Sequence, residues 1–245
     1  MNLVLFADKQ VGLEVTEFLI SKYSEDLSLV VTMADNEIAR LAREAKVSYY
    51  IYDSSDNLYS HISKFGVLLD LGILAWWPKI IEPNILRLPE DGFINFHPSL
   101  LPHNRGKHYN FWAIVERAPF GVTLHFADKD VDSGDLICQK NIVYDWTDTG
   151  GTLYHRAQKE IVELFCTNYP TLRTRKIPRQ KQDLQLGSFH CASELEEASQ
   201  INLDKNYSAR YLFDLVRART FEGYPACWFE AEGKKYEVRV QIKER

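Results

Sequence analysis

The sequence predicts an α/β protein with a Rossmann-like, doubly wound and mostly parallel sheet, followed by a small C-terminal helix and β-hairpin. Short apolar segments alternate with amphipathic helical segments from the first residues onward, which is the rhythm of βαβ units. A basic, proline-containing stretch over 170–181 marks a change of composition. We therefore expect an α/β domain over 1–175 and a linker with a small helix–hairpin unit over 176–245.

The elements of the first domain follow from hydrophobic periodicity. Asp35 is the expected N-cap of its second helix, and Gly72 to Ile81 are expected to form a hydrophobic turn. The expected strands are 3–6, 29–32, 48–52 and 67–71, and the expected helices are 11–24, 36–45 and 57–65.

The remaining elements are less regular. Thr149 and Thr152 offer caps to a long helix, and the basic run after it is interpreted as a solvated linker rather than a phosphate site. The C-terminal hairpin is expected to turn around Glu232 to Lys235. Strands are expected over 122–126, 136–143, 227–231 and 236–242, and helices over 110–117, 152–169 and 208–220.

Composition limits the classes of function. The chain has 245 residues, a net charge of −5 and a 45% hydrophobic content, which argues against nucleic-acid binding through a broad basic surface. No apolar run approaches the ~20 residues of a membrane span, and the N-terminus does not resemble a signal peptide. Four widely spaced cysteines without a Cys-x-x-Cys motif are typical of free thiols in a reducing cytoplasm.

The most informative stretch is Gly92 to Gly106, which contains a short strand ended by Pro98. Proline lacks the N–H that a strand ladder needs, so the strand should end at His97. Alternation places Asn95 and His97 on one face of that strand. Ligand crevices open at such carboxyl ends in α/β sheets. An Asp132-Ser-Gly turn follows in a later loop.

These residues carry a resemblance to a known family. The blocks Asn95-Phe-His-Pro-Ser-Leu-Leu-Pro102, Arg105-Gly106, Trp112-Ala-Ile114, Gly121-Val-Thr-Leu-His-Phe126 and Val131-Asp-Ser-Gly-Asp135 resemble the folate-dependent formyltransferases. The resemblance implies the formyltransferase fold and transfer of a formyl group from N10-formyltetrahydrofolate to an amine. It also implies a catalytic trio, which corresponds here to Asn95, His97 and Asp132.

The side chains of this trio suit formyl transfer, which passes through a tetrahedral oxyanion. The Asn95 amide can donate a hydrogen bond to the oxyanion. His97 can take the proton of the attacking amine, and Asp132 can orient His97 and favour its charged form. We expect His125 to be a core histidine rather than a ligand, and we predict no metal, because the remaining histidines lack metal-like spacing.

The resemblance also implies two backbone-rich loops around the pterin ring of folate. One wall corresponds to Trp77, Lys79 and Ile81, and the opposite wall to Ala127, Asp128 and Asp130. Many residue types can supply backbone contacts, so the identities of these residues test the assignment only weakly.

Within the family, the C-terminal part resembles the short tail of sugar-nucleotide N-formyltransferases, of the dTDP-4-amino-4,6-dideoxyglucose type. A diphosphate needs cations and a thymine needs an aromatic face. The candidate substrate-binding residues are Arg105, Lys107, Tyr109, Arg217, Arg219, Phe221 and Tyr224.

Two other readings stay open. One is a methionyl-tRNA formyltransferase-like enzyme, although the acidic chain and short tail suit tRNA poorly. The other is a folate-binding hydrolase that releases formate from formyltetrahydrofolate. The expected partners are folate and a nucleotide-linked amino sugar, without nucleic acid or membrane, and the hairpin could pair two chains as a homodimer. A cytoplasmic enzyme serving bacterial surface polysaccharide (O-antigen) synthesis is what the resemblance implies.

Overall fold

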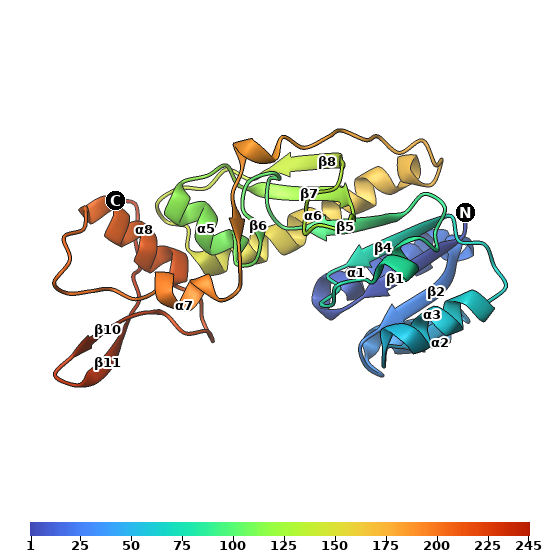
Figure 1. Cartoon of the computed structure of the whole chain (residues 1–245), viewed down its shortest axis with the longest axis horizontal. Helices are drawn as coiled ribbons and strands as arrows, with labels where there is room; N and C mark the ends of the chain where they lie inside the picture. The colour runs from blue at the N-terminus through green and yellow to red at the C-terminus, as the bar shows by residue number, and fades with distance from the viewer. The chain divides into compact units, whose positions relative to one another are not determined.

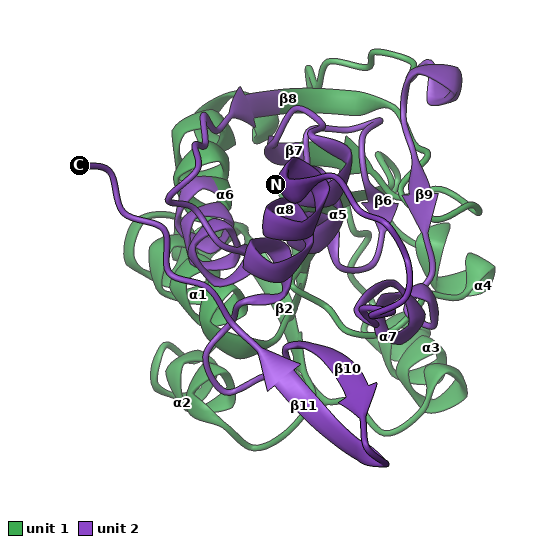
Figure 2. Ribbon diagram, turned by 90° about the vertical axis from the view of Figure 1, so that its left-hand side faces the viewer, with its two compact units in different colours: residues 1–97, 124–138, 161–181 green, residues 98–123, 139–160, 182–245 purple.

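The computed structural model describes all residues, 1–245. The chain divides into two compact units, each made of three segments (Figure 2). Unit 1 contains residues 1–97, 124–138 and 161–181, and unit 2 contains residues 98–123, 139–160 and 182–245. No helix is both long enough and apolar enough to cross a membrane.

The main sheet has seven strands in the order β3-β2-β1-β4-β5-β7-β8 (Figure 1). The pairs β1–β2, β2–β3, β1–β4 and β4–β5 are all parallel, which confirms the α/β prediction. Its strands are β1 (Leu3–Ala7), β2 (Leu27–Thr32), β3 (Tyr49–Ile51), β4 (Leu71–Ala75), β5 (Phe93–His97), β7 (Gly121–Phe126) and β8 (Leu136–Asn141).

Strand order reverses between β1 and β4. From β1 the chain first builds outward through β2 and β3, and it then returns to add β4 and β5 on the other side. A reversal of this kind opens a ligand crevice at the carboxyl ends of the strands. The crevice is therefore expected between the ends of β1 and β4, and β5 ends next to β4.

Apolar strands build the core of unit 1. All five residues of β1 and of β4 are buried, as expected for strands covered on both faces. Val4, Phe6, Leu29 and Phe93 belong to one buried cluster. The Phe6 ring meets the Phe93 ring edge-on, with centroids 5.3 Å apart.

Helices connect the strands, and their caps follow local chemistry. The structure corrects the expected N-cap of α2, because the Asn36 side chain, and not that of Asp35, accepts from the backbone N–H groups of Ile38 and Ala39. The bounds are α1 (Lys9–Tyr23), the 3-10 turn η1 (Ser24–Asp26), α2 (Glu37–Glu44), α3 (Ser55–Lys64), α4 (Pro83–Leu86) and α6 (Gly150–Leu172).

The prediction of a strand over 67–71 was wrong. Leu68 is 90% exposed, and the strand is instead β4, Leu71–Ala75, which pairs with β1 from Leu3↔Leu71 to Ala7↔Ala75. The expected turn over 72–81 is therefore a strand for its first four residues. Asp70 separates two apolar runs in the sequence, and the pairing with β1 selects the second.

Several local predictions were confirmed. Strand β5 ends at His97. Strands β7 and β8 are neighbours, joined by hydrogen bonds from Phe126 N–H to Asp135 O and from Ile142 N–H to Phe120 O. At the start of α6, Thr149 N–H donates to Thr152 Oγ1, and Thr152 N–H donates to Thr149 Oγ1.

The basic run after α6 is paired with carboxylates of unit 1 rather than solvated. Arg173 binds the buried carboxylate of Asp26. Arg175 binds three carboxylates, those of Asp70, Glu90 and Asp91. The expectation of a solvated linker was therefore wrong for these two arginines.

Unit 2 holds the short elements and the C-terminal hairpin. Residues Glu232 and Gly233 both have positive φ, as a two-residue type I′ turn requires. The last strand therefore begins and ends earlier than the expected 236–242. The bounds are β6 (Arg105–Gly106), α5 (Tyr109–Glu116), the 3-10 turn η2 (Leu184–Leu186), β9 (Phe189–His190), α7 (Glu194–Ala198), α8 (Ala209–Arg219), β10 (Cys227–Ala231) and β11 (Lys234–Val238).

Candidate active site

Strand β5 places two polar side chains of the predicted trio in unit 1. Asn95 is half-buried and His97 is 4% exposed. Both lie near the carboxyl end of the strand, on the face that alternation predicted. They are the polar exceptions in a strand whose other members, Phe93, Ile94 and Phe96, are buried and apolar.

A tight turn brings Asp132 to the same place. Asp132 has a φ of 53°, a left-handed conformation that Asp tolerates better than most residues. Ser133 Oγ donates to the carbonyl of Asp130 at 3.0 Å. At Gly134, a Cβ would lie 1.9 Å from the carbonyl oxygen of Phe126, so this close approach requires glycine.

The three side chains form one hydrogen-bonded network. His97 Nδ1 lies 3.2 Å from Asp132 Oδ2, and Asn95 Nδ2 donates to Asp132 Oδ1 at 3.3 Å. The structure thus brings together all three residues that the sequence selected, although they come from a strand and a distant loop.

His125 joins this network from β7. Its Nδ1 lies 2.8 Å from the carbonyl oxygen of Phe126, which can only accept, so Nδ1 carries the proton. In the neutral ring Nε2 is then an acceptor, and it lies 3.1 Å from Asn95 Nδ2. Sequence reasoning assigned His125 to the core. It is buried, at 1% exposure, but its partners are the trio.

The geometry leaves one amide hydrogen of Asn95 available. Acceptors on the two separate hydrogens of one NH2 group would lie about 5–6 Å apart, because the N–H bonds diverge widely. His125 Nε2 and Asp132 Oδ1 lie only 3.6 Å apart. The two acceptors therefore share one hydrogen, and the second N–H can donate elsewhere.

Asp132 is held in its ionised form. Burial alone would raise the pKa of this carboxyl, but the neighbouring imidazole of His97 outweighs burial and holds the pKa far below its usual range. The carboxylate is 9% exposed. An ionised Asp132 that accepts from His97 Nδ1 fixes the ring orientation and leaves Nε2 as the nitrogen that can take a proton.

The residues expected to hold folate also lie in unit 1. Trp77 packs edge-on against Phe6, with ring centroids 5.1 Å apart, and its buried Nε1 has no hydrogen-bond partner. Ile81 is buried and Lys79 is exposed. In the second loop, Asp128 Oδ1 accepts from Lys129 N–H at 2.7 Å.

Some backbone groups of this second loop already form hydrogen bonds within the chain. The Ala127 N–H already donates to the carbonyl of Phe93 at 2.8 Å, and the carbonyl of Asp130 accepts from Ser133 Oγ.

Within the described residues, no group of three or more His, Cys, Asp or Glu side chains is arranged to hold a metal ion.

Candidate substrate residues lie in unit 2, and the first three differ in access. Lys107 is exposed. Arg105 lies 5.9 Å from the centroid of the Phe189 ring, and its Nε is buried without a partner. Tyr109 is buried and stacks between the rings of Phe120 and Tyr154, so burial raises its pKa well above the usual value.

The other four candidates divide into structural and accessible groups. Arg217 is 5% exposed and is bound to Asp214 and to the carbonyls of Asp145 and Asp148. Its position is structural. Burial lowers the pKa of Arg219, whose Nε donates to Ser199 Oγ.

The two aromatic candidates lie together. Phe221 and Tyr224 have ring centroids 4.5 Å apart, and Tyr224 is 53% exposed. This pair can offer an aromatic face, whereas Arg217 cannot offer a free cation.

The family assignment follows from comparison with family models. Residues 20–168 match the formyl transferase model, and residues 194–244 match the N-formyltransferase dimerization C-terminal domain. The first match covers more than half of the chain. The protein therefore belongs to the formyl transferase family.

Relatives from two branches of the family are similar to the chain. The dTDP-4-amino-4,6-dideoxyglucose formyltransferase of Mycobacterium tuberculosis is 27% identical over 61% of this chain and 64% of its own length, which is slightly under two thirds. A methionyl-tRNA formyltransferase of Protochlamydia amoebophila is 27% identical over 99% of this chain and 78% of its own length.

Solved structures confirm the fold over the whole chain. A 4-N formyltransferase from Francisella tularensis superimposes with a TM-score of 0.84 at 24% identity, covering 100% of this chain and 98% of its own. A formyltransferase from Anoxybacillus kamchatkensis, solved with UDP-4,6-dideoxy-4-formamido-L-AltNAc and tetrahydrofolate, gives a TM-score of 0.58 at 26% identity, covering 80% and 89%.

Proposed function

We propose that this protein transfers a formyl group from N10-formyltetrahydrofolate to the amine of a dTDP-linked amino-dideoxy sugar, in particular dTDP-4-amino-4,6-dideoxyglucose. The observation that carries the proposal is the network of Asn95, His97 and Asp132 in a chain of this family. The similarity to the dTDP-4-amino-4,6-dideoxyglucose formyltransferase of Mycobacterium tuberculosis supports a sugar substrate.

In the proposed reaction, the sugar amine attacks the formyl carbon and forms a new C–N bond. Negative charge develops on the formyl oxygen, and this oxygen accepts a hydrogen bond from the remaining N–H of Asn95. One donor of this kind typically lowers the barrier by about 2.7–4 kcal/mol. His97 Nε2 takes the proton of the amine. As the bond from carbon to N10 breaks, that proton passes to N10, so charge and atoms balance.

The formyl donor is a co-substrate that supplies the activated one-carbon group. The chain's own contribution on that side is proposed to be the loop containing Trp77, Lys79 and Ile81, together with the loop from Ala127 to Asp130. The unpartnered buried Nε1 of Trp77 supports this placement, because a buried donor without a partner is costly unless a ligand completes it.

The test is a direct transfer assay. The protein is incubated with N10-formyltetrahydrofolate and a panel of dTDP-linked 3-amino and 4-amino dideoxy sugars, and mass spectrometry reports any formylated sugar. A single formylated member supports the proposal and identifies the acceptor position. If no sugar is formylated, the same assay is repeated with aminoacylated initiator tRNA. The similarity to the methionyl-tRNA formyltransferase of Protochlamydia amoebophila is the specific reason to test this substrate.

A hydrolytic activity is distinguished in the same assay. Formate released at equal rates with and without an amine would identify formyltetrahydrofolate hydrolysis instead. The cytoplasmic setting and a role in bacterial surface polysaccharide synthesis are part of this proposal, and detection of the formylated sugar in the producing cell would test them.

A further inference from the structure

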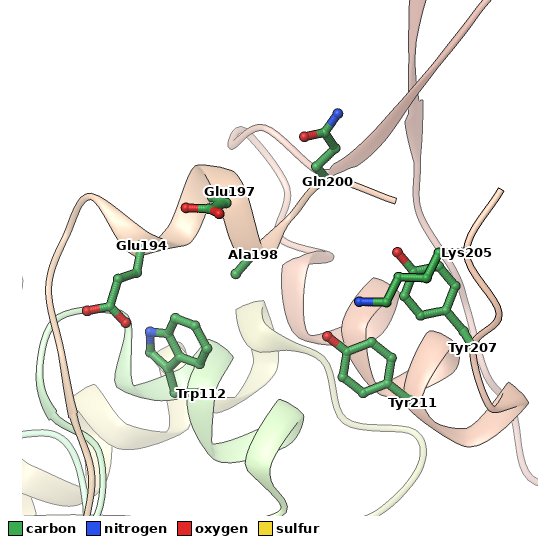
Figure 3. Close-up of a pocket in the computed structure, with 8 residues that line it drawn as sticks. All are labelled: Trp112, Glu194, Glu197, Ala198, Gln200, Lys205, Tyr207 and Tyr211. Atoms are coloured by element: carbon green, nitrogen blue, oxygen red, sulfur yellow. The ribbon is translucent and has the colours of Figure 1, made fainter. Parts of the chain in front are cut away.

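A pocket of about 360 Å³ lies entirely within unit 2 (Figure 3). We call it the aromatic pocket. Its lining residues come from α5, α7, α8 and the segment between the last two helices: Trp112, Glu194, Glu197, Ala198, Gln200, Lys205, Tyr207 and Tyr211. The volume is within the range of small-molecule sites.

One wall of the pocket is pre-organised. The Trp112 ring stacks on His190 with centroids 3.8 Å apart and an interplanar angle of 7°. Both His190 nitrogens contact carboxylates, Glu116 at 2.7 Å and Glu194 at 2.9 Å. The two carboxylate contacts fix the orientation of the His190 ring, and the stacked His190 ring in turn holds the Trp112 ring in place.

The facing wall offers an aromatic surface. Tyr207 and Tyr211 stack with centroids 5.8 Å apart and an interplanar angle of 7°, and Tyr211 is 39% exposed. The Tyr207 hydroxyl accepts from the backbone N–H of Asn202 at 3.1 Å, which fixes that ring. Two parallel, partly exposed rings form a surface on which a further planar ring can stack.

The polar groups are distributed unevenly around this surface. Figure 3 shows Glu194 and Glu197 near Trp112 on one side, and Lys205 beside the tyrosines on the other. Lys205 Nζ lies 5.4 Å from the centroid of the Tyr207 ring. The Trp112 Nε1 is buried without a hydrogen-bond partner. The pocket therefore combines one unused donor (the Trp112 indole N–H), the side-chain amide of Gln200 and one localised cation (Lys205).

We propose that the aromatic pocket binds the pyrimidine base of the nucleotide-linked sugar, with the diphosphate toward Lys205. The inference rests on the proposed function, and it names residues outside the substrate-binding set expected from the sequence. A pyrimidine presents a planar face to Tyr211, carbonyl oxygens to the indole N–H of Trp112, and an alternating donor–acceptor edge that suits the Gln200 amide.

Charge sets the orientation of the ligand. The carboxylates of Glu194 and Glu197 repel a negatively charged phosphate, whereas an uncharged base is not repelled on that side of the pocket. The single cation, Lys205, lies with the tyrosines at the opposite side. A pyrimidine is also smaller than a purine, so it leaves room in the 360 Å³ volume for part of the sugar ring.

The test measures binding of dTDP to the full chain by isothermal titration calorimetry. Tyr211→Ala removes the exposed stacking ring and should raise the Kd by about tenfold, whereas Tyr211→Phe keeps the ring and should bind like wild type. Gln200→Ala should reduce the preference for dTDP over dADP. Tyr59→Ala changes another partly exposed tyrosine, on α3 of unit 1, and is the matched control.

The outcomes separate this inference from the proposed function. Weaker dTDP binding in Tyr211→Ala but not in Tyr211→Phe or Tyr59→Ala, with a raised KM for the sugar nucleotide and an unchanged kcat, supports the pocket. Equal dTDP affinity in wild type, Tyr211→Ala and Gln200→Ala overturns it, even if the sugar is formylated. Absence of dTDP binding to wild type also overturns it, and the transfer assay then decides separately whether the proposed function fails.

Discussion

At the scale of single residues, the site depends on how one amide group is oriented. Asn95 Nδ2 is held by His125 Nε2 at 3.1 Å and by Asp132 Oδ1 at 3.3 Å. Both partners only accept in this arrangement, so the amide cannot flip without placing its oxygen against a carboxylate. His125 is thereby a positioning residue, which acts on the substrate through Asn95.

The variant His125→Phe tests this role. It should lower kcat by about tenfold to a hundredfold, because the Asn95 amide is no longer fixed. This fall should not exceed the fall in kcat that follows when an oxyanion donor is removed outright. The KM for the formyl donor should stay unchanged. His61→Phe, a histidine on α3, is the control. A wild-type kcat in folded His125→Phe would remove His125 from the mechanism.

The lowered pKa of Asp132 predicts how the stability of the folded chain depends on pH. Its pKa is lower in the folded chain, so its stabilising effect is complete above the pKa of an unfolded Asp, about 3.9. The effect is lost as the pH falls below that value toward the lower folded one. The stability difference between wild type and Asp132→Asn should not shrink between pH 7 and pH 5. Urea unfolding across this range measures it, and a difference that vanishes by pH 5 would contradict the account.

The sequence predicted much of this site, but not all of it. Asn95 and His97 share a strand face, which alternation reveals, and Asp132 follows in a glycine-containing turn. His125 lies on a fully buried strand, where a polar residue reads as an ordinary core histidine. Only the pairing of its strand beside β5 shows that its ring meets Asn95.

At the scale of elements, close contact between β4 and β5 positions the catalytic strand. Gly72 of β4 pairs with Phe93 of β5. A Cβ on Gly72 would lie 2.2 Å from Cδ1 of the Phe93 ring. The glycine therefore makes room for a core ring two residues before Asn95.

The variant Gly72→Ala should destabilise the protein by about 1–3 kcal/mol, as overpacked cores do, and should also lower kcat because β5 shifts. Chemical denaturation and the transfer assay measure the two effects. Gly66→Asn is the control, since that position has φ +73° and open space around it, which Asn tolerates. Unchanged stability in Gly72→Ala would show that Phe93 moves without cost.

Element boundaries were harder to predict than element types. The order of strands and helices in unit 1 follows from periodicity, and β5 ends at His97 because Pro98 follows. The position of β4 does not follow, because Val67 to Leu71 is also rich in apolar residues, with Asp70 as the exception, and it adjoins the apolar run Leu71 to Ala75. Pairing with β1 selects the second run, and a pairing partner is not visible in a local pattern.

At the scale of the whole molecule, the C-terminal hairpin suggests an assembly of two chains. Residues 194–244 match a dimerization domain. The rings of Phe229 and Tyr236 stack with centroids 5.4 Å apart, and Tyr236 is 42% exposed. We propose that this hairpin pairs two copies, because an exposed aromatic pair is a typical interface element.

The variant Tyr236→Asp should convert the proposed dimer to a monomer, because an unpaired carboxylate would be buried at the interface. Light scattering on the purified chain measures the particle mass. Tyr59→Asp, on α3, is the control and should leave that mass unchanged. A wild-type chain that is already monomeric at micromolar concentration would exclude this interface.

We propose that the network of Asn95, His97 and Asp132 performs formyl transfer to a nucleotide-linked amino sugar. The most direct measurement compares wild type and His97→Asn in the transfer assay, with folate binding measured in parallel. We expect formylated sugar with wild type, none with His97→Asn, and equal folate affinity for both. Equal rates of formylation by the two proteins would contradict it.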